Sequence, residues 1–208
     1  MTPSSSSNPP VTLTDRARRF FARFITPIVD ALARLGVTPN EVTVFGFFAN
    51  AVVGALAAAG YLTVAGIALL VSSALDGLDG ALARRMGKAG KFGAFLDSTL
   101  DRYSEVVVLL GLLVYATQLG LRTEQLLVYA AAVGALLVSY TRARAESLGV
   151  DCKIGLLTRL ERVVILSAML VSQQVAIGLL LLAVLTHVTA IQRMIYVLRT
   201  LRRAGTPA

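Results

Sequence analysis

The sequence predicts an all-α, polytopic membrane protein with six transmembrane helices preceded by an amphipathic helix at the membrane interface. Three observations support this fold class. The 208-residue chain is 56% hydrophobic and has a mean hydropathy of +0.72, which is too apolar for a soluble domain of this size. Its apolar residues form blocks near the ~20 residues that a helix needs to span a bilayer. Its basic residues gather between alternate blocks, which is typical of cytoplasmic loops.

The first 35 residues precede the apolar blocks and divide into two parts. Residues 1–13 contain no basic segment followed by an apolar core, so we expect a disordered tail and not a signal peptide. Residues 14–35 place their large apolar side chains within an arc of roughly 140° at about 100° per residue, with most arginines opposite. This pattern predicts a helix in the cytoplasmic interface that binds anionic lipid and kinks or divides at Pro27. An amphipathic helix packed on the protein is the alternative.

Six apolar blocks are expected to cross the membrane. The turn at Gly36–Asn40 ends the amphipathic helix, and Thr38 or Asn40 can cap the first span. The fifth block is short, because its uninterrupted apolar run covers only Val163–Val171, and Val163–Ala190 can also be read as one long helix. The predicted spans are 42–60, 64–84, 94–117, 125–147, 158–173 and 175–197.

The distribution of basic residues favours six spans over five. With six alternating spans, all of the 20 Lys and Arg residues except Arg102 and Arg122 fall on one side. Five spans would put the C-terminal arginines outside, against the positive-inside rule. We therefore expect one transmembrane domain, residues 36–203, in the cell (cytoplasmic) membrane with both termini in the cytoplasm. The net charge of +8 then indicates cytoplasmic loops facing anionic lipid, and no nucleic-acid partner is expected.

Four aspartates lie near the cytoplasmic ends of the second and third spans. Spacings of three and four put Asp76 and Asp79 on one helical face, and Asp97 and Asp101 on another. A short glycine-rich connection makes the two helices antiparallel neighbours, so the carboxylates should face each other. Each Asp at the bilayer centre costs roughly 2.5–3.5 kcal/mol, or about 10–14 kcal/mol for all four. We expect this cost to be tolerated only where the carboxylates meet cations.

The composition of this cluster indicates a divalent metal site that acts on phosphate. Hard carboxylate oxygens suit Mg²⁺, Mn²⁺ or Ca²⁺, and the cluster contains no His or Cys, which argues against zinc. Metal ions at this depth can stabilise the attacking and leaving oxygens of a displacement at phosphorus, and Arg84 can pair with a phosphate.

The carboxylates and their neighbours follow the spacing D-x2-D-G-x2-A-R-x8-G-x3-D-x3-D. The residues at its fixed positions are Asp76, Asp79, Gly80, Ala83, Arg84, Gly93, Asp97 and Asp101. This pattern resembles the signature of the CDP-alcohol phosphotransferase (CDP-alcohol phosphatidyltransferase) family, and the resemblance extends to an interfacial helix followed by six spans. It implies a homodimeric transferase that moves a phosphatidyl group from CDP-diacylglycerol to an alcohol and releases CMP.

The resemblance also implies a role for each residue of the pattern. Two Mg²⁺ or Mn²⁺ ions are expected, bound by Asp76, Asp79 and Asp97. Asp101 is expected to be the general base and a further metal ligand. The residues expected to form the CDP pocket are Asp76, Asp79, Gly80, Ala83, Arg84 and Gly93. Beside this pocket the family has a further segment, which is resembled here by Pro39, Asn40 and Thr43. Helix capping would also explain these three residues.

Arginines at the cytoplasmic ends of the last three spans indicate a second site, for a phosphorylated substrate. S-Y-T-R-A-R-A-E (139–146) resembles the bacterial phosphatidylinositol-phosphate synthase branch, in which basic residues on these helices hold the phosphate of inositol phosphate. The matching residues are Arg142, Arg162 and Arg193. Leu160 departs from that branch, which commonly has proline there. Glycerol phosphate, giving phosphatidylglycerol phosphate, and an archaeal-type inositol phosphate lipid synthase are the alternatives.

Two other classes of protein compete with the enzyme. A cation transporter or channel also carries intramembrane acidic residues, but it predicts them throughout the membrane depth, whereas these lie near one end of two helices with an arginine among them. A non-catalytic membrane scaffold leaves the cost of the buried charges unexplained. The sequence therefore favours an enzyme.

Overall fold

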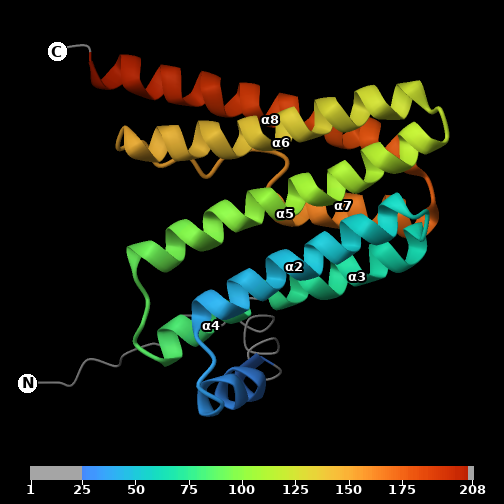
Figure 1. Ribbon diagram of the computed structural model, residues 1–208. Coiled ribbons are helices and arrows are strands. Elements are labelled where there is room, and N and C mark those ends of the chain that lie inside the picture. The colour runs from blue at the N-terminus through green and yellow to red at the C-terminus, as the bar shows by residue number, and fades with distance from the viewer. Residues whose placement is uncertain (1–24, 206–208) are drawn as a thin grey trace, which may run out of the picture.

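The computed structural model describes residues 25–205, and the regular secondary structure of this part is entirely helical (Figure 1). Residues 25–34 form a helical segment. The helices that follow are α2 (Pro39–Ala58), α3 (Leu62–Leu75), α4 (Leu78–Arg85), α5 (Lys91–Gln118), α6 (Arg122–Ser147), α7 (Arg159–Ser172) and α8 (Val175–Ala204). The all-α class is confirmed. The predicted tail, 1–13, and the predicted amphipathic helix as far as residue 24 lie outside the described residues.

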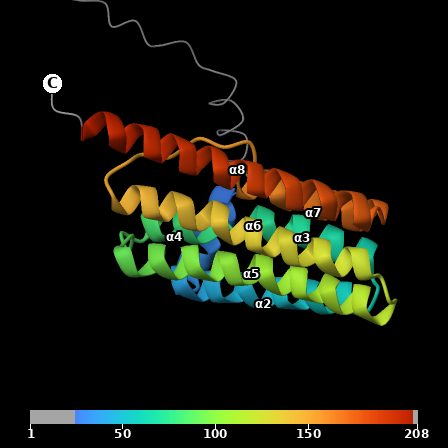
Figure 2. The ribbon, with the colours of Figure 1, turned by 90° about the horizontal axis from the view of Figure 1, so that it is seen from above.

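The long helices run alongside one another in a bundle (Figures 1 and 2). The most extensive packing is between α2 and α5, between α6 and α8, and between α3 and α7, while α5 also packs on α6 and α7 on α8. One apolar core joins these helices, with fully buried side chains such as Val53, Leu112, Leu170 and Leu179. The bundle therefore holds the ends of α3, α4, α5 and α7 close together at one end of the molecule.

Two glycines set how closely α2 and α5 approach. A Cβ added to Gly111 would lie 2.0 Å from the carbonyl oxygen of Gly54, and one added to Gly54 would lie 2.7 Å from that of Val107. Any side chain at either position would push the backbones apart. This contact fixes the spacing between the two helices that carry Thr43, Asp97 and Asp101.

Residues 25–34 pack on α4. Val29 is buried against Leu78 and Leu82, and Asp30 accepts a hydrogen bond from Arg85 at 2.8 Å. The described part of the predicted amphipathic helix therefore packs on the protein, and its place in the membrane interface, which such packing allows, stays a prediction. Ile28 remains 44% exposed, so the segment keeps an apolar side chain at its surface.

Between residues 25 and 205, four helical stretches are long and apolar enough to cross a membrane: Pro39–Ala58, Leu62–Arg85, Arg122–Ser147 and Val175–Arg203. The protein is therefore a multi-pass membrane protein by helix composition. Two of the predicted spans are not among these stretches. Helix α5 has 28 residues but carries charged residues of the site, and α7 has only 14 residues. The single long helix over 163–190 is wrong, because α7 ends at Ser172 and Gln173 has a left-handed backbone (φ 60°).

Candidate active site

A break in the second span positions the first two aspartates. Helix α3 ends at Leu75, Asp76 is its C-cap, and α4 begins at Leu78. Sequence periodicity predicts one continuous helix here, and the apolar pattern contains no signal for the break other than Gly77. The break turns Asp79 toward α2, where its carboxylate is buried.

Asp79 is held on both carboxylate oxygens. The hydroxyl of Thr43 on α2 donates to Oδ2 at 2.7 Å, and the backbone N–H of Gly80 donates to Oδ1 at 2.5 Å. Thr38, not Asn40, caps α2, through a capping box with Glu41. Capping therefore does not explain Thr43, whose side chain belongs to the aspartate cluster.

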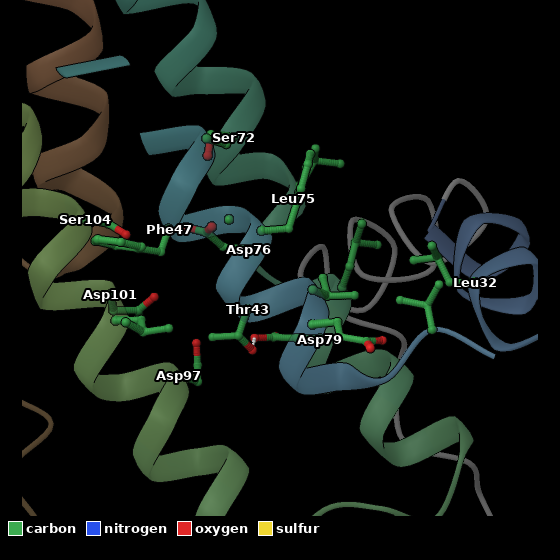
Figure 3. Close-up of a pocket in the computed structure, with 18 of the residues that line it drawn as sticks. Leu32, Thr43, Phe47, Ser72, Leu75, Asp76, Asp79, Asp97, Asp101 and Ser104 are labelled. Atoms are coloured by element: carbon green, nitrogen blue, oxygen red, sulfur yellow. Dashed lines mark hydrogen bonds between the residues drawn. The ribbon is translucent and has the colours of Figure 1, made fainter. Parts of the chain in front are cut away.

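All four aspartates line one cavity of about 600 Å³. Figure 3 shows Asp79, Asp97 and Asp101 pointing into the space between α2, α4 and α5. The remaining walls are largely apolar. They include Ile28 and Leu32 of the N-terminal segment together with Phe45, Phe47 and Leu75. The cavity thus combines an acidic end with an apolar body.

A second cavity, of about 410 Å³, adjoins the first. Thr43, Asp79 and Asp97 line both. Of the residues expected in or beside the CDP pocket, all except Asp76 line it, namely Pro39, Asn40, Thr43, Asp79, Gly80, Ala83, Arg84 and Gly93. Lys88 lines it too and was not predicted, although it lies in the glycine-rich connection between the aspartate pairs. The structure therefore brings these predicted residues together, while their roles remain predictions.

The three predicted acceptor arginines share a small cavity of about 60 Å³ on the other side of Asp101. Arg162 is 4% exposed and donates to both carboxylate oxygens of Glu105, at 2.6 and 2.8 Å. Arg193 is also buried and donates to the carbonyl oxygens of Ile154 and Val138, at 2.8 and 2.7 Å.

Arg142 is the exposed member of this arginine group. Its Nε donates to Glu146 at 2.8 Å, one turn further along α6. The pair is about half exposed on both sides, so Arg142 can turn toward a ligand at little cost.

Arg159, at the first position of α7, is the main site residue that was not predicted. Its Nη2 lies 2.6 Å from Oδ2 of Asp76, and its Nη1 lies 2.8 Å from Oδ2 of Asp101. Arg102, by contrast, lies 3.9 Å from Asp101. The only sequence signal for Arg159 is an arginine at the start of a span, and no local spacing connects it to residues 76 and 101.

The aspartate cluster fits a divalent cation by its chemistry, since Mg²⁺ and Mn²⁺ prefer carboxylate oxygens. As the side chains lie, however, no group of three or more His, Cys, Asp or Glu residues between 25 and 205 is arranged to hold one ion. The guanidinium of Arg159 spans two of the four carboxylates in this arrangement. A divalent cation and Arg159 would use the same oxygen atoms.

The fold and the site define a multi-pass α-helical membrane protein whose carboxylates converge on two joined cavities. Residues 36–200 match the CDP-alcohol phosphatidyltransferase family, and the chain belongs to this family of enzymes. An archaetidylinositol phosphate synthase of Methanothermobacter thermautotrophicus is 38% identical over 200 residues, which cover 91% of this chain and 96% of that protein.

Solved structures give the same result. The crystal structure of Mycobacterium tuberculosis phosphatidylinositol phosphate synthase with CDP-DAG bound is similar with a TM-score of 0.81 at 33% identity, covering 85% of this chain and 94% of that one. The structure of that protein with manganese and citrate gives a TM-score of 0.77 at 33% identity, covering 83% and 88%. The family resemblance seen in the aspartate pattern is thereby confirmed.

Proposed function

We propose that this protein transfers the phosphatidyl group of CDP-diacylglycerol to a hydroxyl of inositol phosphate and releases CMP. The observation that carries the proposal is the continuity of the site. Asp79 and Asp97 line both the 600 and the 410 Å³ cavities, and Asp101 lies between the large cavity and the arginine cavity. A lipid, a nucleotide and a phosphorylated alcohol can therefore meet at one set of carboxylates.

The donor fits the two larger cavities. The cytidine diphosphate would occupy the 410 Å³ cavity, where Arg84 and Lys88 supply positive charge. The diacylglycerol part would extend into the larger cavity, along Ile28, Leu32 and Phe45. The Mycobacterium tuberculosis enzyme, crystallised with CDP-DAG, supports this choice of donor. An ether-linked CDP-lipid is the second candidate, since a relative is an archaetidylinositol phosphate synthase.

The acceptor would bind beside Asp101. Arg142, Arg162 and Arg193 line the cavity there, and arginine is well suited to bind phosphate. The names of relatives from both bacteria and archaea specify inositol phosphate lipids, which favours inositol phosphate. Glycerol phosphate is the competing acceptor, because it presents the same phosphate to the same arginines.

The reaction is a displacement at the phosphorus that carries the diacylglycerol. The acceptor oxygen forms the new P–O bond, the bond to CMP breaks, and Asp101 accepts the hydroxyl proton. Asp76, Asp79, Asp97 and Asp101 would hold Mg²⁺ or Mn²⁺, in our proposal two ions, which would neutralise the diphosphate charge. Thr43 and the Gly80 N–H keep Asp79 oriented, and the arginines keep the acceptor phosphate beside Asp101.

We further propose six spans, with α5 and α7 as the third and fifth and with the site and both termini in the cytoplasm. At about 1.5 Å per residue, α5 is ~42 Å long and exceeds the ~30 Å hydrocarbon core. Helix α7 is shorter, but it packs between α3 and α8. A homodimer in the cell membrane completes the proposal, and light scattering in detergent would test it.

The decisive assay measures CMP release by detergent-purified protein from CDP-diacylglycerol with Mg²⁺. The panel of acceptors is inositol phosphate, glycerol phosphate, free inositol and none. We expect CMP and a phosphatidylinositol phosphate product with inositol phosphate alone, full loss in EDTA, and recovery with Mg²⁺ or Mn²⁺. CMP release that is unchanged in EDTA would refute the metal mechanism, and a preference for glycerol phosphate would replace the acceptor.

A further inference from the structure

Arg159 connects the donor and acceptor halves of the site. Its two terminal nitrogens bond Asp76, at the α3–α4 break, and Asp101 on α5. The same residue lines the arginine cavity with Arg142, Arg162 and Arg193. One side chain thus contacts the carboxylates on one side and borders the acceptor cavity on the other.

The side chain of Arg159 has room to move between these two environments. It is 35% exposed, whereas that of Arg162 on the next turn of α7 is 4% exposed. Arg162 is fixed by a bidentate ion pair with Glu105. Arg159 instead starts the helix after the 149–158 loop, and its contacts are charge–charge bonds that another cation can replace.

We propose that Arg159 competes with the divalent cation for Asp76 and Asp101, and that metal binding transfers its guanidinium to the acceptor cavity. This inference rests on the proposed metal site. Both bonds of Arg159 use Oδ2 atoms, and a divalent cation binds carboxylate oxygens more strongly than a single-charged guanidinium at the same distance, because the Coulomb energy scales with charge. Displacement would then free Arg159, which already lines the acceptor cavity, to bind phosphate there.

The exchange would order the binding steps. As long as Arg159 pairs with Asp76 and Asp101, its guanidinium is not free to bind the acceptor phosphate. Metal binding at these two carboxylates would free it. By linkage, metal and acceptor phosphate should therefore increase each other's affinity.

The test is a Mn²⁺ titration followed by electron paramagnetic resonance, with the full-length protein in detergent and no substrate. Arg159→Gln removes the competitor, so we expect it to bind Mn²⁺ about tenfold more tightly than the parent protein. Arg102→Gln is the matched control. It removes the same charge from a residue 3.9 Å from Asp101, and we expect a change below about threefold. Arg159→Lys keeps the charge but not the two terminal nitrogens that contact the two carboxylates, so its affinity for Mn²⁺ should be intermediate. This variant serves as the test if the glutamine variant does not fold.

A second measurement follows thermal stabilisation by inorganic phosphate with and without Mn²⁺. We expect Mn²⁺ to increase the phosphate effect in the parent protein and not in Arg159→Gln. Weaker Mn²⁺ binding by Arg159→Gln, or equal tightening by Arg102→Gln, would overturn the competition alone. Absence of Mn²⁺ binding by the parent protein would overturn the proposed metal site as well.

Discussion

The carboxylate half and the arginine half of the site are held in opposite ways. The aspartates come from one short stretch, 76–101, and Asp97 and Asp101 project from a single helix face into a cavity. The arginines come from three helices, and two of them are buried and bound to distant groups of the protein: Arg162 to Glu105, and Arg193 to the carbonyls of Ile154 and Val138. The acidic half lines cavities that a ligand can enter, whereas two of the arginines in the basic half are also part of the structure.

This difference predicts two kinds of mutational effect. Replacing an aspartate should reduce catalysis but change the free energy of unfolding little, since the charge of an aspartate is unfavourable in the membrane. Replacing a buried arginine should reduce stability and binding together, because the partner left behind is buried and unpaired.

The largest effect is expected from Asp101→Asn. The amide has the same shape but cannot accept a proton or bind a cation well, so CMP release should fall by about 10³-fold or more. Thermal unfolding should shift little. Asp151→Asn is the control, because Asp151 is exposed in the loop after α6 and raises the pKa of Lys153 through a 2.7 Å hydrogen bond, away from the site. If Asp101→Asn destabilises the protein enough to explain its loss of activity, the acidic and basic halves of the site do not differ in this way.

The next effect is on stability. Arg162→Met leaves Glu105 without its partner and should lower the free energy of unfolding by about 3–5 kcal/mol, measured by denaturation in detergent. The double variant Glu105→Leu/Arg162→Met should recover most of this loss without recovering transfer to inositol phosphate. Arg85→Met breaks a pair whose arginine is 64% exposed and should change stability by less than about 1 kcal/mol. If Arg162→Met and Arg85→Met lowered the free energy of unfolding equally, burial of the arginine would not decide its contribution to stability.

The same contrast explains what the sequence could predict. Helical periodicity is local, so spacings of three and four identify the faces that carry Asp79, Asp97 and Asp101, and the repeated basic loops indicate the orientation. The partners of Arg159, Arg162 and Arg193 lie 83, 57 and 55 positions away, and no local pattern encodes such contacts. The break after Leu75 is not predicted because its one sequence signal is Gly77, and an isolated glycine is tolerated inside a helical pattern.

A third prediction separates acceptor binding from structure by using the exposed arginine. Arg142→Gln should raise the KM for inositol phosphate about 10- to 100-fold, the loss of a charge-assisted hydrogen bond. The KM for CDP-diacylglycerol and the unfolding midpoint should change little, because the side chain of Arg142 is about half exposed and pairs with Glu146 one turn along the same helix. Arg144→Gln, on the same helix outside the cavity, is the control. A parallel rise in both KM values would mean that Arg142 does not belong to a separate acceptor site.

The smallest expected effect tests how firmly the acidic half must be held. Thr43→Val keeps the shape of the side chain but removes the 2.7 Å hydrogen bond to Asp79, whose other oxygen still accepts the Gly80 N–H. CMP release should fall about three- to tenfold, since a single hydrogen bond is lost and the carboxylate remains. Thr43→Ser restores a hydroxyl and should restore most of the activity. If valine and serine reduce activity equally, Thr43 acts through packing in the cavity wall, and the orientation of Asp79 comes from the α3–α4 break and the Gly80 N–H.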